Sequence, residues 1–187
     1  EHVDGIQLFN SHTYFNLAGD SRRDILEHQL RIAADQITEV DHDCIPTGSF
    51  MEVSDTPFNF KDFHAIGERI DQKHAQLEWG NGYDHNFVLK SDKGFEPPSA
   101  SVFEPVSGRR LDLYATQPGL QFYSGNSLLK GCKGKNNSLI QPRYAFCLEP
   151  QHFPDSPNHN HFPTTILDPG ERYSHQLAMK FSVIKDI

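Results

Sequence analysis

The sequence predicts an all-β fold, an antiparallel sandwich or barrel, and three observations support this class. Short segments in which apolar and polar residues alternate recur along the chain, as they do in half-buried strands. The 13 glycines and 12 prolines are spread over the whole length and separate these segments instead of marking one linker. Only one segment has the spacing of a helix. Many short strands between regular turns are typical of sandwiches and barrels.

The strands follow one another along most of the chain. Leu30 and Ile32 alternate with polar neighbours, Leu111 and Leu113 do the same, and near the C-terminus every second residue from Leu177 to Val183 is apolar. Strands are predicted, in chain order, over residues 5–10, 28–33, 49–53, 86–90, 100–103, 109–114, 120–124, 145–148 and 176–184. The whole chain, residues 1–187, is predicted to form a single domain, because 187 residues are typical of one domain.

One helix and one mobile loop interrupt this pattern. The helix is predicted over residues 61–70, where Phe63, Ile66 and Ile70 recur at helical spacing. Residues 131–137, rich in glycine, lysine and asparagine, are predicted to be a mobile loop.

Composition and charge exclude several classes of function. The net charge of −8, from 17 basic and 25 acidic residues, argues against a nucleic-acid binder, which needs clustered Lys and Arg. No apolar run is long enough for a transmembrane helix, so no membrane partner is expected. The N-terminal residues do not resemble a signal peptide, and the missing initiator Met indicates that the true start is absent or processed. Cys44, Cys132 and Cys147 are too scattered for a disulfide scaffold, and free thiols are expected.

Common catalytic and metal-binding motifs do not identify a function for this sequence. No G-x-S-x-G elbow, P-loop or G-x-G-x-x-G is present, so these motifs support neither acyl transfer, nucleotide hydrolysis nor dinucleotide binding. The 11 histidines suggest the hypothesis of a metal site, with His159-x-His161 and Asp155 or His152 as ligands. Residues 154–163 contain three prolines, however, so histidines that anchor a loop are favoured and no metal is predicted.

Three stretches place a chargeable group among aromatic residues and turn formers: residues 10–17, 82–87 and 147–155. Glu149 follows the apolar run 145–148, and burial at the end of a strand raises a carboxylate pKa and suits it to act as a base. The alternative is a glutamate that ends a strand in solvent. Likewise, His12 is either a site residue or a satisfied core histidine, and Asp84 is either a site residue or the cap of the turn 80–82.

These stretches resemble the aldose 1-epimerase (galactose mutarotase) family. The matching segments occur in family order over essentially the whole chain: His12-Thr13-Tyr14-Phe15-Asn16-Leu17-Ala18-Gly19, Ile45-Pro46-Thr47-Gly48, Thr56-Pro57-Phe58, Gly82-Tyr83-Asp84-His85-Asn86-Phe87, Ser107-Gly108-Arg109, Thr116-Gln117-Pro118-Gly119-Leu120-Gln121-Phe122-Tyr123, Leu148-Glu149-Pro150-Gln151, and Asn158 through Phe162-Pro163 to Pro169-Gly170-Glu171-x-Tyr173.

The resemblance implies a fold, a reaction and a set of site residues. The fold would be the large antiparallel β-sandwich of this family, its supersandwich. The reaction would interconvert the α and β anomers of free hexoses such as galactose and glucose, without a cofactor and in the cytoplasm. Residues matching Glu149 and His12 are the general base and general acid of the family. Those matching Asp84 and Gln121 lie in its sugar site.

The chain departs from the family pattern in three ways. Ser11 stands where Asn usually precedes the acid His, and Pro150 stands where Thr or Ser usually follows the base. Because proline fixes φ and lacks an N–H, Pro150 is expected to re-aim the strand end that carries Glu149. The chain also resembles only the C-terminal portion of the family, so the N-terminal strands, with an Arg and a further His of the sugar site, are expected to come from a missing half or a second chain.

Two functional hypotheses follow. The first is an aldose 1-epimerase, with a base and an acid on opposite sides of the sugar. The second is a non-catalytic carbohydrate-binding or regulatory protein on the same scaffold. A third, weaker interpretation is an inactive fragment without a sugar site.

Overall fold

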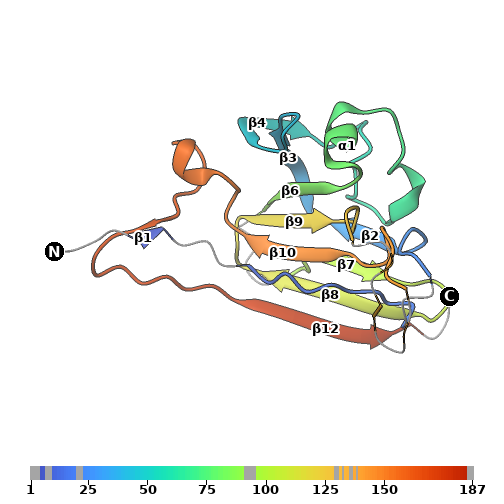
Figure 1. The fold of residues 1–187 in the computed structure, drawn as a ribbon. Coiled ribbons are helices and arrows are strands. Elements are labelled where there is room, and N and C mark those ends of the chain that lie inside the picture. Colours follow the sequence, from blue (N-terminus) through green and yellow to red (C-terminus); the bar gives the residue numbers. More distant parts are fainter. Residues whose placement is uncertain are drawn as a thin grey trace.

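The chain folds into two packed antiparallel sheets, as a sandwich requires (Figure 1). The computed structural model describes residues 5–6, 10–19, 23–90, 96–128, 131, 133–134, 137 and 139–184. Cys132 and much of the predicted loop 131–137 lie outside these residues. None of the helices in the described part of the chain has the length and hydropathy that a bilayer crossing requires.

The first sheet, here called the site sheet, has the strand order β10-β9-β6-β3-β4. Its strands are β3 (Ala34–Val40), β4 (Pro46–Glu52), β6 (Asp84–Leu89), β9 (Gly119–Tyr123) and β10 (Cys147–Gln151). Every neighbouring pair is antiparallel.

The second sheet has the order β12-β8-β7-β2-β5, and its apolar residues share one core with those of the first sheet. Its strands are β2 (Gln29–Ile32), β5 (His64–Ala65), β7 (Ala100–Phe103), β8 (Arg109–Ala115) and β12 (Leu177–Val183). A separate pair joins β1 (Gly5–Ile6) to β11 (Ile166–Leu167). The described residues also form short helical turns: η1 (Ile66–Glu68), α1 (Ala75–Gly80) and η4 (Ser156–Asn158).

The strands predicted from residue 28 onward are confirmed, although their ends shift by a few residues. Of the strand predicted over 5–10, β1 covers Gly5–Ile6, and residues 7–9 lie outside the described residues. The sequence pattern misses β3, which lies inside the site sheet between β4 and β6. Its register shifts between Ala34 and Gln36 and again between Thr38 and Val40, as it does at β-bulges. Each such shift breaks the period-two alternation on which the prediction rests.

The helix predicted over 61–70 is wrong. The segment instead contributes β5 and the single turn η1. The backbone N–H of Ile66 donates to the carbonyl of His28, and that of Gly67 donates to the carbonyl of Leu26. These bonds to another segment replace the bonds that a helix would make within itself. The α-helix α1 follows instead, the only one among the described residues. The His74 side chain accepts from the Gln76 N–H at its start, and the left-handed Asn81 lies at its end.

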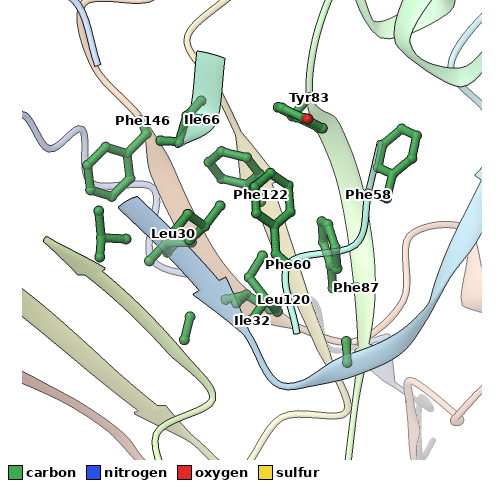
Figure 2. Packing of buried hydrophobic residues seen from close by; sticks show 14 of the residues in the cluster. Leu30, Ile32, Phe58, Phe60, Ile66, Tyr83, Phe87, Leu120, Phe122 and Phe146 are labelled. Atoms are coloured by element: carbon green, nitrogen blue, oxygen red, sulfur yellow. The ribbon is translucent and has the colours of Figure 1, made fainter. Parts of the chain in front are cut away.

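The core between the sheets is rich in aromatic side chains. Figure 2 shows Phe58, Phe60, Tyr83, Phe87 and Phe122 packed together, and each is at most 1% exposed. Some of their rings meet edge to face, for example Phe60 and Phe122 with centroids 5.9 Å apart, and others are tilted, for example Tyr83 and Phe122. The Tyr83 hydroxyl donates to the carbonyl of Pro57, so this buried polar atom is paired. Such rings bury large apolar areas, so this cluster fixes how the two sheets face each other.

Two histidines are buried in neutral form at the edges of this core. His28 Nε2 accepts the backbone N–H of Leu17 at 3.0 Å, and burial lowers the pKa of His28 to about 4. His85 Nδ1 accepts the N–H of Asp84 and its ring lies 4.7 Å from that of Phe58; burial lowers the pKa of His85 to about 3. In the unfolded chain both titrate near 6.5.

Acidification should therefore weaken the fold through these two side chains. Since the unfolded state binds their protons first, their contribution is complete above pH 6.5 and is lost as pH falls toward their folded pKa values. Between pH 7 and pH 5, each histidine lowers the free energy of unfolding by about 2 kcal/mol. We expect His28→Gln, which keeps an acceptor for Leu17, to reduce the change in unfolding free energy over this interval by that amount in urea titrations. His42→Gln, at an exposed position, is the control; an equal change in both variants would contradict the assignment.

Candidate active site

Three rows of side chains cross the face of the site sheet that points away from the core. Because the strands are antiparallel and in register, Cys147, Tyr123 and Asp84 lie side by side in the first row. Glu149, Gln121 and Asn86 form the second row, and Gln151, Gly119 and Val88 form the third. The intervening residues, such as Leu120, Phe122 and Leu148, point into the core. Alternation along three strands thus gathers polar residues that are far apart in the sequence.

This face carries a cavity of about 630 Å³, within the range of small-molecule sites. It contains the four residues predicted for the site and seven others, and it is lined by Asn10, His12, Tyr14, Asp84, Gln121, Tyr123, Glu149, Gln151, His152, Pro154 and Asp155. The second cavity described, near Arg143, contains none of the predicted site residues.

Glu149 is the buried carboxylate of the cavity. It is 4% exposed, which contradicts the alternative of a glutamate ending a strand in solvent. Its Oε2 accepts a hydrogen bond from Asn10 Nδ2 at 2.8 Å, and its Oε1 lies 3.4 Å from His12 Nε2. Burial raises the pKa of Glu149; the nearby Asp84 raises it further, while His12 lowers it. Raised basicity in a cleft suits a residue that takes and returns a proton.

His12 reaches Glu149 from a separate segment. An isolated bridge, in which Phe15 and Phe146 exchange two backbone hydrogen bonds, fixes residues 10–19 beside the start of β10. The His12 side chain is 48% exposed, which contradicts the alternative of a core histidine. Its ring lies 5.0 Å from that of Tyr14 and 6.5 Å from that of Tyr123. His12 and Glu149 are in direct contact, not on opposite sides of the cavity as expected.

Asp84 and Gln121 form the other side of the cavity. Gln121 Nε2 donates to Asp84 Oδ1 at 2.7 Å. Burial raises the pKa of Asp84, and the bond from Gln121 and the nearby His12 oppose this effect. The turn 80–82 is held by Asn126, whose Nδ2 donates to the carbonyls of Gly80 and Tyr83, so Asp84 is not needed as its cap.

Pro150 does not re-aim the strand end. β10 continues through Pro150 to Gln151, which pairs with Gly119, so Glu149 stays in register with Gln121. β10 is the last strand of the site sheet as described, and proline is tolerated in such an edge strand.

Sequence reasoning missed Asn10 and Gln151, which flank the Glu149 carboxylate. Asn10 Nδ2 also donates to Gln151 Oε1 at 3.1 Å. Gln151 was detectable, since it is the next residue on the Glu149 face of β10. For Asn10 the sequence offered only an indirect signal, which is that Ser11 replaces the Asn of the family pattern. In the structure the side-chain amide of Asn10, one residue earlier, donates to the Glu149 carboxylate.

The contacts of His159 and His161 confirm the favoured interpretation, in which these histidines anchor a loop; His159 Nε2 also lies 3.3 Å from Asp155 Oδ2. His159 Nε2 lies 3.2 Å from the carbonyl of Pro46, and His161 Nε2 lies 2.7 Å from that of Gly48. Both therefore anchor the loop after β10 onto β4. In the cavity, ligand atoms of His12, Cys147 and Glu149 lie within 4.8 Å of one another. However, Cys147 and Glu149 approach opposite nitrogens of the His12 ring, which does not suit binding of one ion.

Asn10 should tune the basicity of Glu149. Its hydrogen bond stabilises the charged carboxylate, so Asn10→Ala should raise the pKa of Glu149 further. We expect this increase in a carbon-13 NMR titration of the glutamate carboxyls. Ser11→Ala is the matched control, because Ser11 pairs with Thr13 and not with Glu149. The same Glu149 titration in both variants would show that the hydrogen bond from Asn10 does not affect the pKa of Glu149.

Comparisons with known proteins agree with the resemblance seen in the sequence. The model of a family described as aldose 1-epimerase matches residues 9–180. Galactose mutarotases from Rattus norvegicus and Homo sapiens are each 42% identical over 173 residues, which cover 92% of this chain and 49% of each relative. An aldose 1-epimerase from Escherichia coli K12 is 34% identical over 177 residues, 91% of this chain and 49% of its own length.

Solved structures give the same result. A GalM/aldose epimerase homologue from C. elegans superposes with a TM-score of 0.83 at 27% identity, covering 97% of this chain and 53% of that one. A galactose 1-epimerase from Lactobacillus acidophilus NCFM superposes with a TM-score of 0.76 at 28% identity, covering 94% and 49%. The chain thus spans about half the length of the curated relatives it matches.

Proposed function

The chain belongs to the aldose 1-epimerase family, and on that basis we propose that it interconverts the α and β anomers of free hexoses such as galactose and glucose. One observation carries the proposal beyond family membership. A buried carboxylate of raised pKa touches an imidazole in the wall of a cavity that fits a small molecule. The preceding Arg and His of the family, supplied by a further segment or chain, are part of this proposal, as is a cytoplasmic location; both rest on the resemblance.

The proposed reaction needs only proton transfers. Glu149 takes the proton of the C1 hydroxyl, the C1–ring oxygen bond breaks as the aldehyde forms, and His12 gives a proton to the ring oxygen. Rotation about C1–C2 exposes the other aldehyde face. Closure then reverses both transfers and restores both groups. The two reacting oxygens are bonded to the same carbon, so an acid and a base in direct contact suit them.

Asp84 and Gln121 are proposed to bind sugar hydroxyls. The Asp84 carboxylate accepts hydrogen bonds, and Gln121 Oε1 has no partner among the described residues although it is buried. Both therefore offer acceptors toward a polyol. Tyr14 and Tyr123 add aromatic surface to the same cavity, as expected for a ligand with apolar C–H faces.

Replacement of the base tests the reaction. Glu149→Gln keeps the shape and the acceptor for Asn10 but removes the basic carboxylate. We expect the catalysed decay of optical rotation of fresh α-galactose to slow by about 100-fold or more, with little change in thermal melting. Glu27→Gln, at an exposed position, is the control and should keep full activity. More than about a tenth of the parent rate in Glu149→Gln would be incompatible with a base of that strength.

Sugar affinity tests the second pair of residues. A hydrogen bond to a charged group is worth about 1.5–3 kcal/mol and one between neutral groups about 0.5–1.5. Asp84→Ala should therefore weaken galactose binding by about tenfold or more, and Gln121→Ala by a few-fold, as measured by calorimetry. Asp62→Ala, an exposed carboxylate, serves as control.

Unchanged affinity in both cavity variants would remove Asp84 and Gln121 from the sugar site. Binding of galactose without acceleration in the parent protein would instead support the carbohydrate-binding alternative.

A further inference from the structure

Cys147 is a buried titratable side chain that the proposed reaction does not use. It is 0% exposed and lies two residues before Glu149, on the same face of β10. It does not line the cavity, although its neighbours Tyr123 and Glu149 do. Its Sγ lies 3.4 Å from His12 Nδ1. Cys147 therefore contacts the His12 imidazole outside the cavity lining, while Glu149 contacts it in the cavity wall.

The His12 ring is thus held at both nitrogens. Nδ1 meets the Cys147 sulfur, and Nε2 meets Glu149 Oε1 at 3.4 Å. The two partners come from one strand at positions i and i+2, so β10 sets the distance between them. From this geometry we propose that Cys147 is a positioning residue, which holds the His12 ring so that Nε2 carries the exchangeable proton toward Glu149 and the sugar.

A thiol is suited to this role because it serves both charge states of the ring. Burial raises the pKa of Cys147 to about 12, so it is a protonated thiol at neutral pH. When the imidazole is neutral, S–H donates to Nδ1 and leaves the ring proton on Nε2. When the imidazole is charged, the sulfur accepts from Nδ1–H. The ring keeps its placement while the proton at Nε2 is given and taken.

The same features argue against a nucleophilic or redox role. A reactive cysteine needs an exposed, stabilised thiolate, whereas burial and the nearby Glu149 and Asp84 carboxylates all raise the pKa of Cys147. Its action is therefore exerted through His12. This inference rests on the proposed function for its catalytic consequence, but the placement of the ring is measurable without turnover.

Nitrogen-15 NMR of the His12 ring tests the placement directly at pH 8, where a typical imidazole is neutral. Glu149 also favours a proton on Nε2, so four proteins are compared: the parent, Cys147→Ala, Glu149→Gln, and the double variant. His12→Gln identifies the signal. We expect the Nε2–H tautomer to dominate in the parent and in Glu149→Gln. In the double variant the Nδ1–H tautomer should rise about threefold, as expected for the loss of one weak hydrogen bond.

Two controls separate positioning from general damage. Cys147→Ser keeps an O–H that donates and accepts, and it should restore the parent nitrogen shifts and tautomer ratio. Cys44→Ala, at the exposed cysteine, should change neither. If Cys147→Ala leaves the Nδ1 shift unchanged, and the double variant matches Glu149→Gln, the proposal is wrong and Glu149 alone orients the ring.

Kinetics provide the second readout. Cys147→Ala should lower kcat about threefold with KM unchanged, since the contact is to His12 and not to the sugar, and Cys147→Ser should recover it. If the NMR changes occur in a protein that never accelerates mutarotation, the ring placement stands and the proposed function fails. If kcat falls without any change at Nδ1, the loss reflects packing, and the positioning role is rejected.

Discussion

The register of β10 on β9 and of β9 on β6 is the constraint on which the site depends. It places Glu149 beside Gln121 and Asp84 beside Tyr123. A slip of one residue would turn these side chains into the core and bring Leu120 and Phe122 to the surface. Those two residues are fully buried against the aromatic cluster. The packing of the core therefore sets the geometry of the cavity, although no core residue lines it.

Gly119 shows how tightly this face is built. A Cβ at this position would lie 2.2 Å from Asn86 Oδ1 and 3.0 Å from Phe153. Phe153 lies in the loop that follows β10, and His159 and His161 fix this loop on β4. The absence of a side chain at Gly119 thus allows the loop after β10 to pack against the sheet. His152, Pro154 and Asp155 then form one wall of the cavity.

The cavity concentrates negative charge, and neighbouring groups make this tolerable. Glu149 is buried and Asp84 is half-buried, and this burial raises the pKa of each. Asn10 donates to one carboxylate and Gln121 to the other, while His12 interacts with both. Two acidic groups held in this way combine basicity at Glu149 with acceptor capacity at Asp84. Raised carboxylate pKa values inside a cavity are more typical of a functional site than of a purely structural one.

The sequence by itself determined the fold class, most strands and four of the residues that line the cavity. Alternating apolar residues define strands because the side-chain period is local, and the family resemblance singled out Glu149, His12, Asp84 and Gln121. Only the tertiary structure decided the rest. The register shifts of β3 remove the period-two alternation of its apolar residues. The segment 61–70 forms backbone hydrogen bonds with His28 and Leu26 in place of the hydrogen bonds of a helix. The contacts of Asn10 and Cys147 with Glu149 and His12 span more than 130 residues. Such contacts follow from how strands and loops come together, and no local pattern encodes them.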